Sequence, residues 1–271
     1  MPDIKYCYPN TNVLKNKLNI IDKSDLFKAE RELTFIRLQE LIQKPIKGKF
    51  NFDHLMKIHK YIFQDLYDWA GKCRTVDIGK GNLFCTVQCL QSYGKVVFEN
   101  YYPQCKMNAN NYDDFIKVLS NNFADLNALH PFREGNGRTQ REFTRLVCLD
   151  CGYILDFSNV KQEDMITASV LSFNKGDNHL LNNIFQHSVI PIHEYTKSKY
   201  DILLTSKGIP KSHKADEFEY YDKNNYPKVT LYNVIYKEKI KQMQSNNIIE
   251  KTKFLIKNGQ NPIIQSNTKI R

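Results

Sequence analysis

The feature that most constrains this 271-residue chain is a segment with proline and glycine at residues 130–141, which reads HPFREGNGRTQR and lies between two helical patterns. Residues 111–129 place apolar side chains three and four positions apart, which predicts a helix. Pro131 disfavours helical geometry at the residue before it, so we expect His130 at the end of this helix. A further helix is predicted for residues 137–150. The chain must therefore turn sharply between two helices.

The same segment combines residue types that bind phosphate groups. Gly135 and Gly137 let the backbone bend and approach a ligand closely. The helix that begins near Gly137 would direct its first N–H groups into the loop, which makes an anion site. Arg138 and Arg141 lie three residues apart, on one face of the first turn, and both can reach phosphate oxygens. Glu134 would repel phosphates unless a cation lies between them, so its presence indicates Mg²⁺.

Helical periodicity also dominates the rest of the chain. It predicts further helices at about residues 26–43, 52–68, 159–171 and 180–187. Ser158 is expected to cap the third of these. Residues 71–86 carry Gly79 and Gly81 on either side of a lysine, between two short β-prone runs, which predicts a small hairpin and is the only convincing strand signal. The expected fold is mainly α, a helical bundle with one small β-hairpin.

The net charge of +10 is unevenly distributed along the chain. Residues 1–190 carry 24 basic and 21 acidic side chains, whereas residues 191–271 carry 15 and 8. We therefore expect a main domain at residues 1–190 and a basic extension at 191–271, partly helical at about 237–256. A Lys-rich solvated tail explains the excess charge, although a patch that recruits an acidic partner stays open and nucleic acid is the less favoured partner.

The chain has seven cysteines, no run of about 18 apolar residues and no apolar stretch at its start. These features predict a cytoplasmic protein with reduced thiols and no membrane contact. Cys148 and Cys151 have metal-ligand spacing, but no second pair completes a zinc site. Since they fall within an apolar helical pattern, we expect them to behave as small hydrophobic residues.

Two of these segments resemble the motifs of Fic-domain proteins. Residues 130–141 match the family signature HPFx(D/E)GNGRxxR at every defined position. Residues 66–74, which read LYDWAGKCR, are followed by residues 78–81 and Phe84. This run is similar to the one that leads into the family's β-hairpin flap, so the predicted hairpin would be that flap, over residues 75–84. A solvent-exposed hairpin without a role is the alternative.

Two weaker similarities extend the match. Residues 8–18 resemble the start of many bacterial members, and residues 174–177 resemble the segment that the family places near the nucleotide base. The resemblance thus covers about residues 8–190 and implies a Fic-type helical bundle with the flap over the active site. It leaves residues 191–271 unexplained.

The resemblance implies a Mg²⁺-dependent transfer of AMP from ATP to a Tyr, Ser or Thr hydroxyl of a target protein, with release of pyrophosphate. His130 would be the general base and Glu134 the Mg²⁺ ligand. Asn136 and nearby backbone N–H groups would hold the α-phosphate, Arg138 the β-phosphate and Arg141 the γ-phosphate. The other residues placed around the nucleotide are Lys80, Gly81, Arg133, Gly135, Gly137 and Asn174.

Two alternative functions stay open. Kinase-like members of the family have Lys at the position of Gly137 and transfer the γ-phosphate. A glycine fits AMP transfer, so phosphorylation of a protein, or use of another nucleotide donor, is the alternative within the family. Outside it, the alternative is a basic protein that binds nucleic acid through residues 191–271, which would leave the cluster at residues 130–141 without a purpose.

A missing pattern bears on regulation. Many Fic proteins carry an inhibitory helix with the pattern (S/T)xxxE(G/N), whose glutamate pairs with the second arginine of the motif. No glutamate of this chain has Ser or Thr four residues before it. The chain therefore resembles the members that a separate antitoxin restrains, and we expect such a partner to supply a glutamate to Arg141.

Overall fold

The computed structural model describes residues 4–80, 82–192 and 194, and these residues form two compact units. The first unit contains residues 4–47 and 56–73, and the second contains residues 48–55 and those from residue 74 onward. The helix expected at residues 237–256 lies outside the described residues, and the domain division at residue 190 stays a prediction. No helix in the described part is both long and apolar enough to cross a membrane.

In the first unit, α1 (Lys23–Gln43) confirms the helix predicted for residues 26–43. Asp22 caps it, since its side chain accepts a hydrogen bond from the Asp25 N–H at 2.9 Å. α2 (Phe52–Phe63), whose first four residues are assigned to the second unit, is shorter than predicted. After Phe63 the chain continues in a turn at residues 64–66, and Leu66 and Tyr67 are buried without helical geometry.

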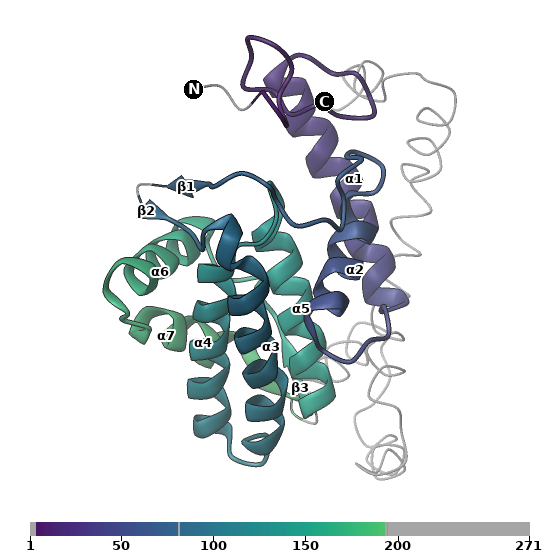
Figure 1. Cartoon of the computed structure of the whole chain (residues 1–271). Helices are drawn as coiled ribbons and strands as arrows, with labels where there is room; N and C mark the ends of the chain where they lie inside the picture. Colours follow the sequence, from purple (N-terminus) through teal and green to yellow (C-terminus); the bar gives the residue numbers. More distant parts are fainter. Residues whose placement is uncertain (1–3, 81, 193, 195–271) are drawn as a thin grey trace, which may run out of the picture. The chain divides into compact units, whose positions relative to one another are not determined.

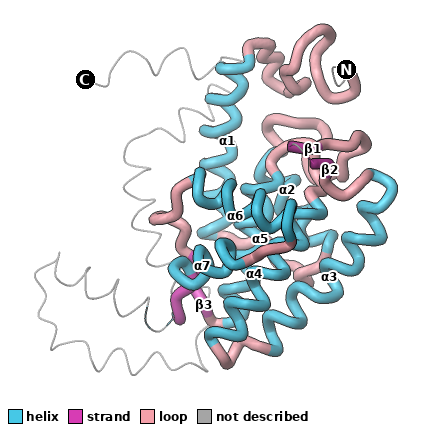
Figure 2. Tube along the Cα trace, turned by 90° about the vertical axis from the view of Figure 1, so that its left-hand side faces the viewer, coloured by secondary structure: helices cyan, strands magenta, loops and turns pink. Residues whose placement is uncertain are grey.

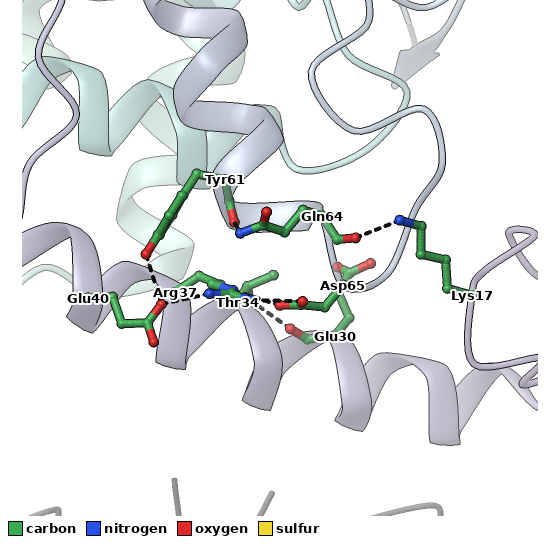
Figure 3. Close-up of polar contacts among 8 residues, drawn as sticks. All are labelled: Lys17, Glu30, Thr34, Arg37, Glu40, Tyr61, Gln64 and Asp65. Atoms are coloured by element: carbon green, nitrogen blue, oxygen red, sulfur yellow. Dashed lines mark hydrogen bonds and ion pairs between the residues drawn. The ribbon is translucent and has the colours of Figure 1, made fainter. Parts of the chain in front are cut away.

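A cluster of charged side chains holds α1 to the segment that follows α2 (Figure 3). Arg37 donates from Nε and Nη2 to both carboxylate oxygens of Asp65, at 2.6 and 2.8 Å. Its Nη1 donates to Glu40 at 2.8 Å, and the Tyr61 hydroxyl donates to the same Glu40 oxygen at 3.0 Å. The planar fork of the guanidinium suits this two-point pairing with a carboxylate. In this cluster of Arg37, Glu40 and Asp65, which we call the α1 cluster, every charged group therefore contacts a group of opposite charge.

The second unit is a helical bundle in which α4 (Tyr112–Leu129) is central (Figures 1 and 2). It packs against α3 (Leu90–Met107), α5 (Asn136–Cys151), α6 (Gln162–Lys175) and α7 (His179–Ser188). The side chains that fill the space between these helices are almost fully buried: Phe115, Leu119, Phe123, Leu126, Phe143, Val147 and Phe185. Cys148 and Cys151 are buried in the same helix face, as expected for small apolar residues.

Two small sheets accompany the bundle. The predicted hairpin is confirmed: β1 (Gly79–Lys80) pairs antiparallel with β2 (Asn82–Leu83). A second sheet was not predicted: β3 (Tyr153–Leu155) pairs antiparallel with β4 (Val189–Pro191). The two strands lie far apart in the sequence and are very short, so neither gives a local pattern.

Two further expectations about helices need correction. α3 was not predicted, because Gly94 and Pro103 interrupt its pattern. Gly94 is required by packing, since a Cβ there would lie 2.9 Å from the Phe52 ring. α6 begins at Gln162 rather than directly after Ser158, and its N-cap residue, Lys161, makes no side-chain cap. A short 3₁₀ helix, η1 (Val87–Cys89), leads from the hairpin into α3.

Candidate active site

The turn between α4 and α5 has the geometry that its proline and glycines require. His130 is the C-cap of α4, with φ 42° and ψ 59°, and its N–H donates to the Leu126 carbonyl at 3.3 Å. Gly135 precedes α5 with φ 81°, a left-handed conformation that glycine adopts without strain. The loop therefore carries the His130 side chain at one end and the N-terminus of α5 at the other.

Asn136 fixes the shape of this loop from within. Its side chain is 3% exposed and forms two hydrogen bonds with the backbone of buried Phe132. The Phe132 N–H donates to Oδ1 at 2.9 Å, and Nδ2 donates to the Phe132 carbonyl at 2.7 Å. Any contact of this amide with an α-phosphate would add to these bonds, and that role stays a prediction.

The imidazole of His130 has a defined tautomer. Its Nδ1 lies 3.1 Å from the carbonyl oxygen of Asn127, one turn earlier in α4. A carbonyl can only accept, so Nδ1 carries the hydrogen and Nε2 bears the lone pair of the neutral ring. The flap residue Phe84 stacks on the same ring, with centroids 3.8 Å apart and an angle of 10° between the planes. The ring orientation is thus set on two sides.

The start of α5 concentrates positive charge. Arg138 Nη2 lies 3.7 Å from Glu134 Oε1, which also accepts the Gly135 N–H at 2.8 Å. Among the residues that the structure describes, the Arg141 side chain makes no ion pair and no hydrogen bond. Burial, and then the nearby Arg138 charge, lower the pKa of Arg141. A bound anion would relieve both effects.

Gly137 leaves room for this guanidinium. Its φ is not left-handed, so the backbone alone does not require glycine. A Cβ at Gly137 would lie 3.1 Å from Arg141 Nη1, closer than most such contacts. The glycine therefore allows the Arg141 side chain to lie against the first turn of α5.

The flap is linked to two sides of the bundle. Asn82 Nδ2 donates to Oδ1 of Asn174, which is exposed near the end of α6, at 2.7 Å. Directly after β2, the Phe84 ring also contacts Phe173, with centroids 5.1 Å apart. The next N–H, that of Cys85, donates to the Ala128 carbonyl at 3.0 Å. The hairpin is thus fixed at its base, next to the ring of His130.

An apolar groove of about 670 Å³ runs beside the flap. Its lining combines residues of the flap, η1, α3 and α6, among them Leu83, Phe84, Cys89, Tyr93, Val96 and Phe173. Leu83 and Val96 are among the most exposed large apolar side chains of the described part. Phe84 belongs both to the groove and to the stack on His130, so the groove adjoins the catalytic candidate.

Comparisons with known proteins assign the family. The family model described as Fic/DOC matches residues 49–148. The protein adenylyltransferase VbhT of Bartonella schoenbuchensis is 37% identical over 185 residues, which cover 68% of this chain and 38% of VbhT. The probable protein adenylyltransferase y4lH of Sinorhizobium fredii is 35% identical over 170 residues, which cover 62% of this chain and 87% of that protein. This chain belongs to the Fic/DOC family.

A solved structure agrees with this membership. The N-terminal Fic domain of a VirB-translocated Bep effector protein from Bartonella quintana, solved with bound ADP, has a TM-score of 0.66. It is 26% identical, and the match covers 70% of this chain and 97% of that one. The prediction of a Fic-type, mainly helical fold with a small hairpin is therefore confirmed.

A Mg²⁺ ion held by Glu134 stays a prediction, and the loop between α4 and α5 is compatible with one way in which this ion binds. The described residues contain no group of three or more His, Cys, Asp or Glu side chains that could hold a metal by themselves. Mg²⁺ at phosphate sites commonly uses only one or two carboxylates, with substrate phosphates and water as its other ligands. Glu134 is half-exposed and lies beside the N-terminus of α5, which fits this mode.

Most of the predicted residues of the Fic site lie on the loop between α4 and α5 and on the first two turns of α5. They are His130, Arg133, Glu134, Gly135, Asn136, Gly137, Arg138 and Arg141. Asn174 is separate in sequence and reaches the flap through Asn82. Lys80 belongs to β1, and Gly81 lies outside the described residues. The roles of these individual residues stay predictions.

Proposed function

We propose that this chain is a protein adenylyltransferase, which transfers AMP from ATP to a Tyr, Ser or Thr hydroxyl of a target protein. Family membership and the names of its relatives support this activity. The observation that carries it is the arrangement around the start of α5: a histidine of fixed tautomer, a half-exposed carboxylate and a partly buried arginine without an acidic partner in the described part.

In the proposed reaction, Nε2 of His130 accepts the proton of the target hydroxyl. The hydroxyl oxygen forms a bond to the α-phosphorus of ATP while the bond to the α,β-bridging oxygen breaks, and pyrophosphate leaves. Arg138 would bind the β-phosphate and Arg141 the γ-phosphate, while N–H groups at the start of α5 would face the α-phosphate. Glu134 is the residue that would hold Mg²⁺, which supplies positive charge to the phosphates when bound.

The flap would hold the target. A hairpin edge binds an extended peptide through backbone hydrogen bonds, which tolerate many sequences. The groove beside the flap would accept an apolar side chain near the acceptor hydroxyl, because its lining is mainly apolar. Lys80, Gly81, Arg133 and Asn174 would contact the nucleotide around this edge. Residence in the cytoplasm stays a prediction.

The activity is tested with purified protein and a cell lysate as the source of targets. ATP labelled on the α-phosphate should label a protein band, and His130→Ala should reduce the rate by about 10²–10⁴-fold, the usual contribution of a general base. His187→Ala is a matched control, because His187 also has its Nδ1 near a carbonyl one turn earlier, that of Asn183 at 2.7 Å, but is exposed on α7. It should leave the rate unchanged.

Three outcomes would contradict this proposal or one of its parts. Label from the γ-phosphate with none from the α-phosphate would select the kinase-like transfer. Label that persists in His130→Ala, while calorimetry shows unchanged ATP binding, would exclude His130 as the base. Steep salt-dependent binding of DNA or RNA that survives His130→Ala would favour the nucleic-acid alternative.

Regulation by a separate inhibitory chain is part of the proposal. Arg141 has no acidic partner among the described residues, which supports a role for a glutamate from another protein. The isolated chain should therefore transfer AMP without any activating mutation. An isolated chain that is inactive, yet gains activity when one of its own glutamates is replaced, would contradict this.

A further inference from the structure

Arg74 lies between the flap and the loop that joins α4 to α5, which we call the catalytic loop, and it is 1% exposed. Its guanidinium donates to backbone carbonyls in three different chain segments. Nε donates to the His130 carbonyl at 2.9 Å, Nη1 to that of Val76 at 3.0 Å, and Nη2 to that of Cys85. Val76 precedes β1 and Cys85 follows β2. One side chain therefore holds both ends of the flap and the residue proposed as the base.

The backbone of Arg74 strengthens the same link. Its N–H donates to the Pro131 carbonyl at 2.8 Å, so Arg74 binds two consecutive carbonyls of the turn. His130 holds a left-handed conformation there, which costs free energy in a residue other than glycine. The two bonds help to keep the turn in this conformation, and with it the direction of the imidazole.

A cation is costly in so buried a place unless hydrogen bonds or an opposite charge compensate it, and the three carbonyls supply such bonds to Arg74. One acidic group lies beside it, that of Asp77, whose Oδ1 is 3.6 Å from Nη1 and whose side chain is 49% exposed. The same oxygen accepts the Val87 N–H at 2.8 Å, next to the flap. Lysine has a single ammonium group and cannot reach three divergent carbonyls, whereas the rigid fork of arginine can.

We propose that Arg74 is a positioning residue that couples the flap to His130. Arg74 sets the distance between the flap and the imidazole, so that a target hydroxyl bound along the flap reaches Nε2 of His130. This role rests on the proposed function. Phe84 makes the coupling tight, because it directly precedes Cys85 and its ring lies 3.8 Å from that of His130. If the chain at Phe84 and Cys85 shifts, the Phe84 ring that stacks on the His130 imidazole therefore shifts with it.

The test compares Arg74→Lys with Arg37→Lys, a matched control in which another multiply bonded arginine is changed in the other unit. We expect Arg74→Lys to leave the Kd for ATP, measured by calorimetry, within about threefold of the wild type. The rate of α-label transfer at saturating ATP should fall about 10–100-fold, as small misplacements of reacting groups do. Amide hydrogen exchange at Phe84 and Cys85 should accelerate. Arg37→Lys should change neither the rate nor this exchange.

Each result decides the matter. A parallel loss of ATP affinity and transfer, or unchanged exchange at Phe84 and Cys85, would overturn the coupling and leave only a role in folding. If Arg74→Lys does not fold, Asp77→Asn should give a smaller change in the same direction, and its absence would equally overturn the proposal. If the wild type transfers no label, the proposed function fails; the coupling then stands or falls by amide exchange and by the NMR titration of the His130 ring, which Arg74→Lys should shift.

Discussion

Two arginine clusters, one in each unit, differ in what the protein places around the charge. On α1, Arg37 faces the carboxylates of Asp65 and Glu40, and hydrogen bonding to Asp65 raises its pKa above the ordinary value. On α5, Arg141 faces no carboxylate among the described residues. Burial and the like charge of Arg138 lower its pKa instead.

The difference fits a role for Arg37 in stabilising the fold and the proposed role of Arg141 in binding phosphate. A charge that opposite charges surround contributes to folding, and its loss leaves carboxylates without compensation. A charge that is removed from water beside a like charge is unfavourable until an anion binds, and such groups concentrate at functional sites. The comparison thus supports the proposed anion site by an argument that does not use the sequence motif.

The largest expected contrast comes from removing each arginine in turn. Arg141→Ala should lower kcat/KM for ATP by about 10²–10³-fold, the usual cost of losing one such contact to a transition state. The unfolding free energy of this variant should stay equal or rise, because an unfavourable, partly buried charge is removed. Arg37→Ala should keep kcat/KM for ATP but lose about 1–3 kcal/mol of unfolding free energy. Initial rates and urea denaturation measure the two effects.

The contrast would break if the two variants behaved alike. Equal losses of stability would mean that Arg141 has an acidic partner outside the described residues. A large loss of ATP use in Arg37→Ala, at full occupancy of the folded state, would mean that the α1 cluster also serves the site.

A smaller change tests the space that Arg141 occupies. Gly137→Ala should raise the KM for ATP on the order of 10-fold, because the new Cβ would lie 3.1 Å from Nη1 and move the guanidinium. Stability should not fall, since Gly137 has an ordinary φ and alanine favours helices over glycine by about 0.5–1 kcal/mol. In the Arg141→Ala background the same change should have no effect on KM. A persistent effect there would mean that Gly137 acts through another group.

The sequence allowed the catalytic loop to be predicted in most of its local features. Pro131 and Gly135 dictate where one helix ends and the next begins, so the placement of His130 followed from backbone preferences alone. The structure added what Asn136 does: both polar ends of its amide bind the backbone of Phe132. Spacing cannot reveal this, because an asparagine in a loop can face either inward or outward.

Contacts between distant segments could not be predicted. Arg74 and His130 are 56 positions apart, and nothing in the periodicity indicates that one binds the other's carbonyl. The same holds for the stack of Phe84 on His130, although the sequence run that contains Phe84 was identified. α3 was missed for a different reason. Its glycine and proline normally indicate the end of a helix, and packing in the folded chain overrode this local preference.

The smallest predicted effect tests how much the Tyr61 hydroxyl contributes to the stability of the α1 cluster. Tyr61→Phe removes the hydroxyl that donates to Glu40 but keeps the ring, whose centroid lies 5.3 Å from the Arg37 guanidinium carbon. The unfolding free energy should fall by about 0.5–1.5 kcal/mol at neutral pH. Burial, and then the bond to Glu40, raise the pKa of Tyr61, so the folded chain holds this proton more tightly than the unfolded chain does. Stability therefore falls as pH rises above about 10, the ordinary tyrosine pKa, in the wild type but not through this group in the variant. The difference in unfolding free energy between the two chains, measured by urea denaturation at several pH values, should shrink in this pH range. A constant difference would mean that the proton of the hydroxyl does not stabilise the folded chain. The hydrogen bond to Glu40 would then contribute less than its distance indicates.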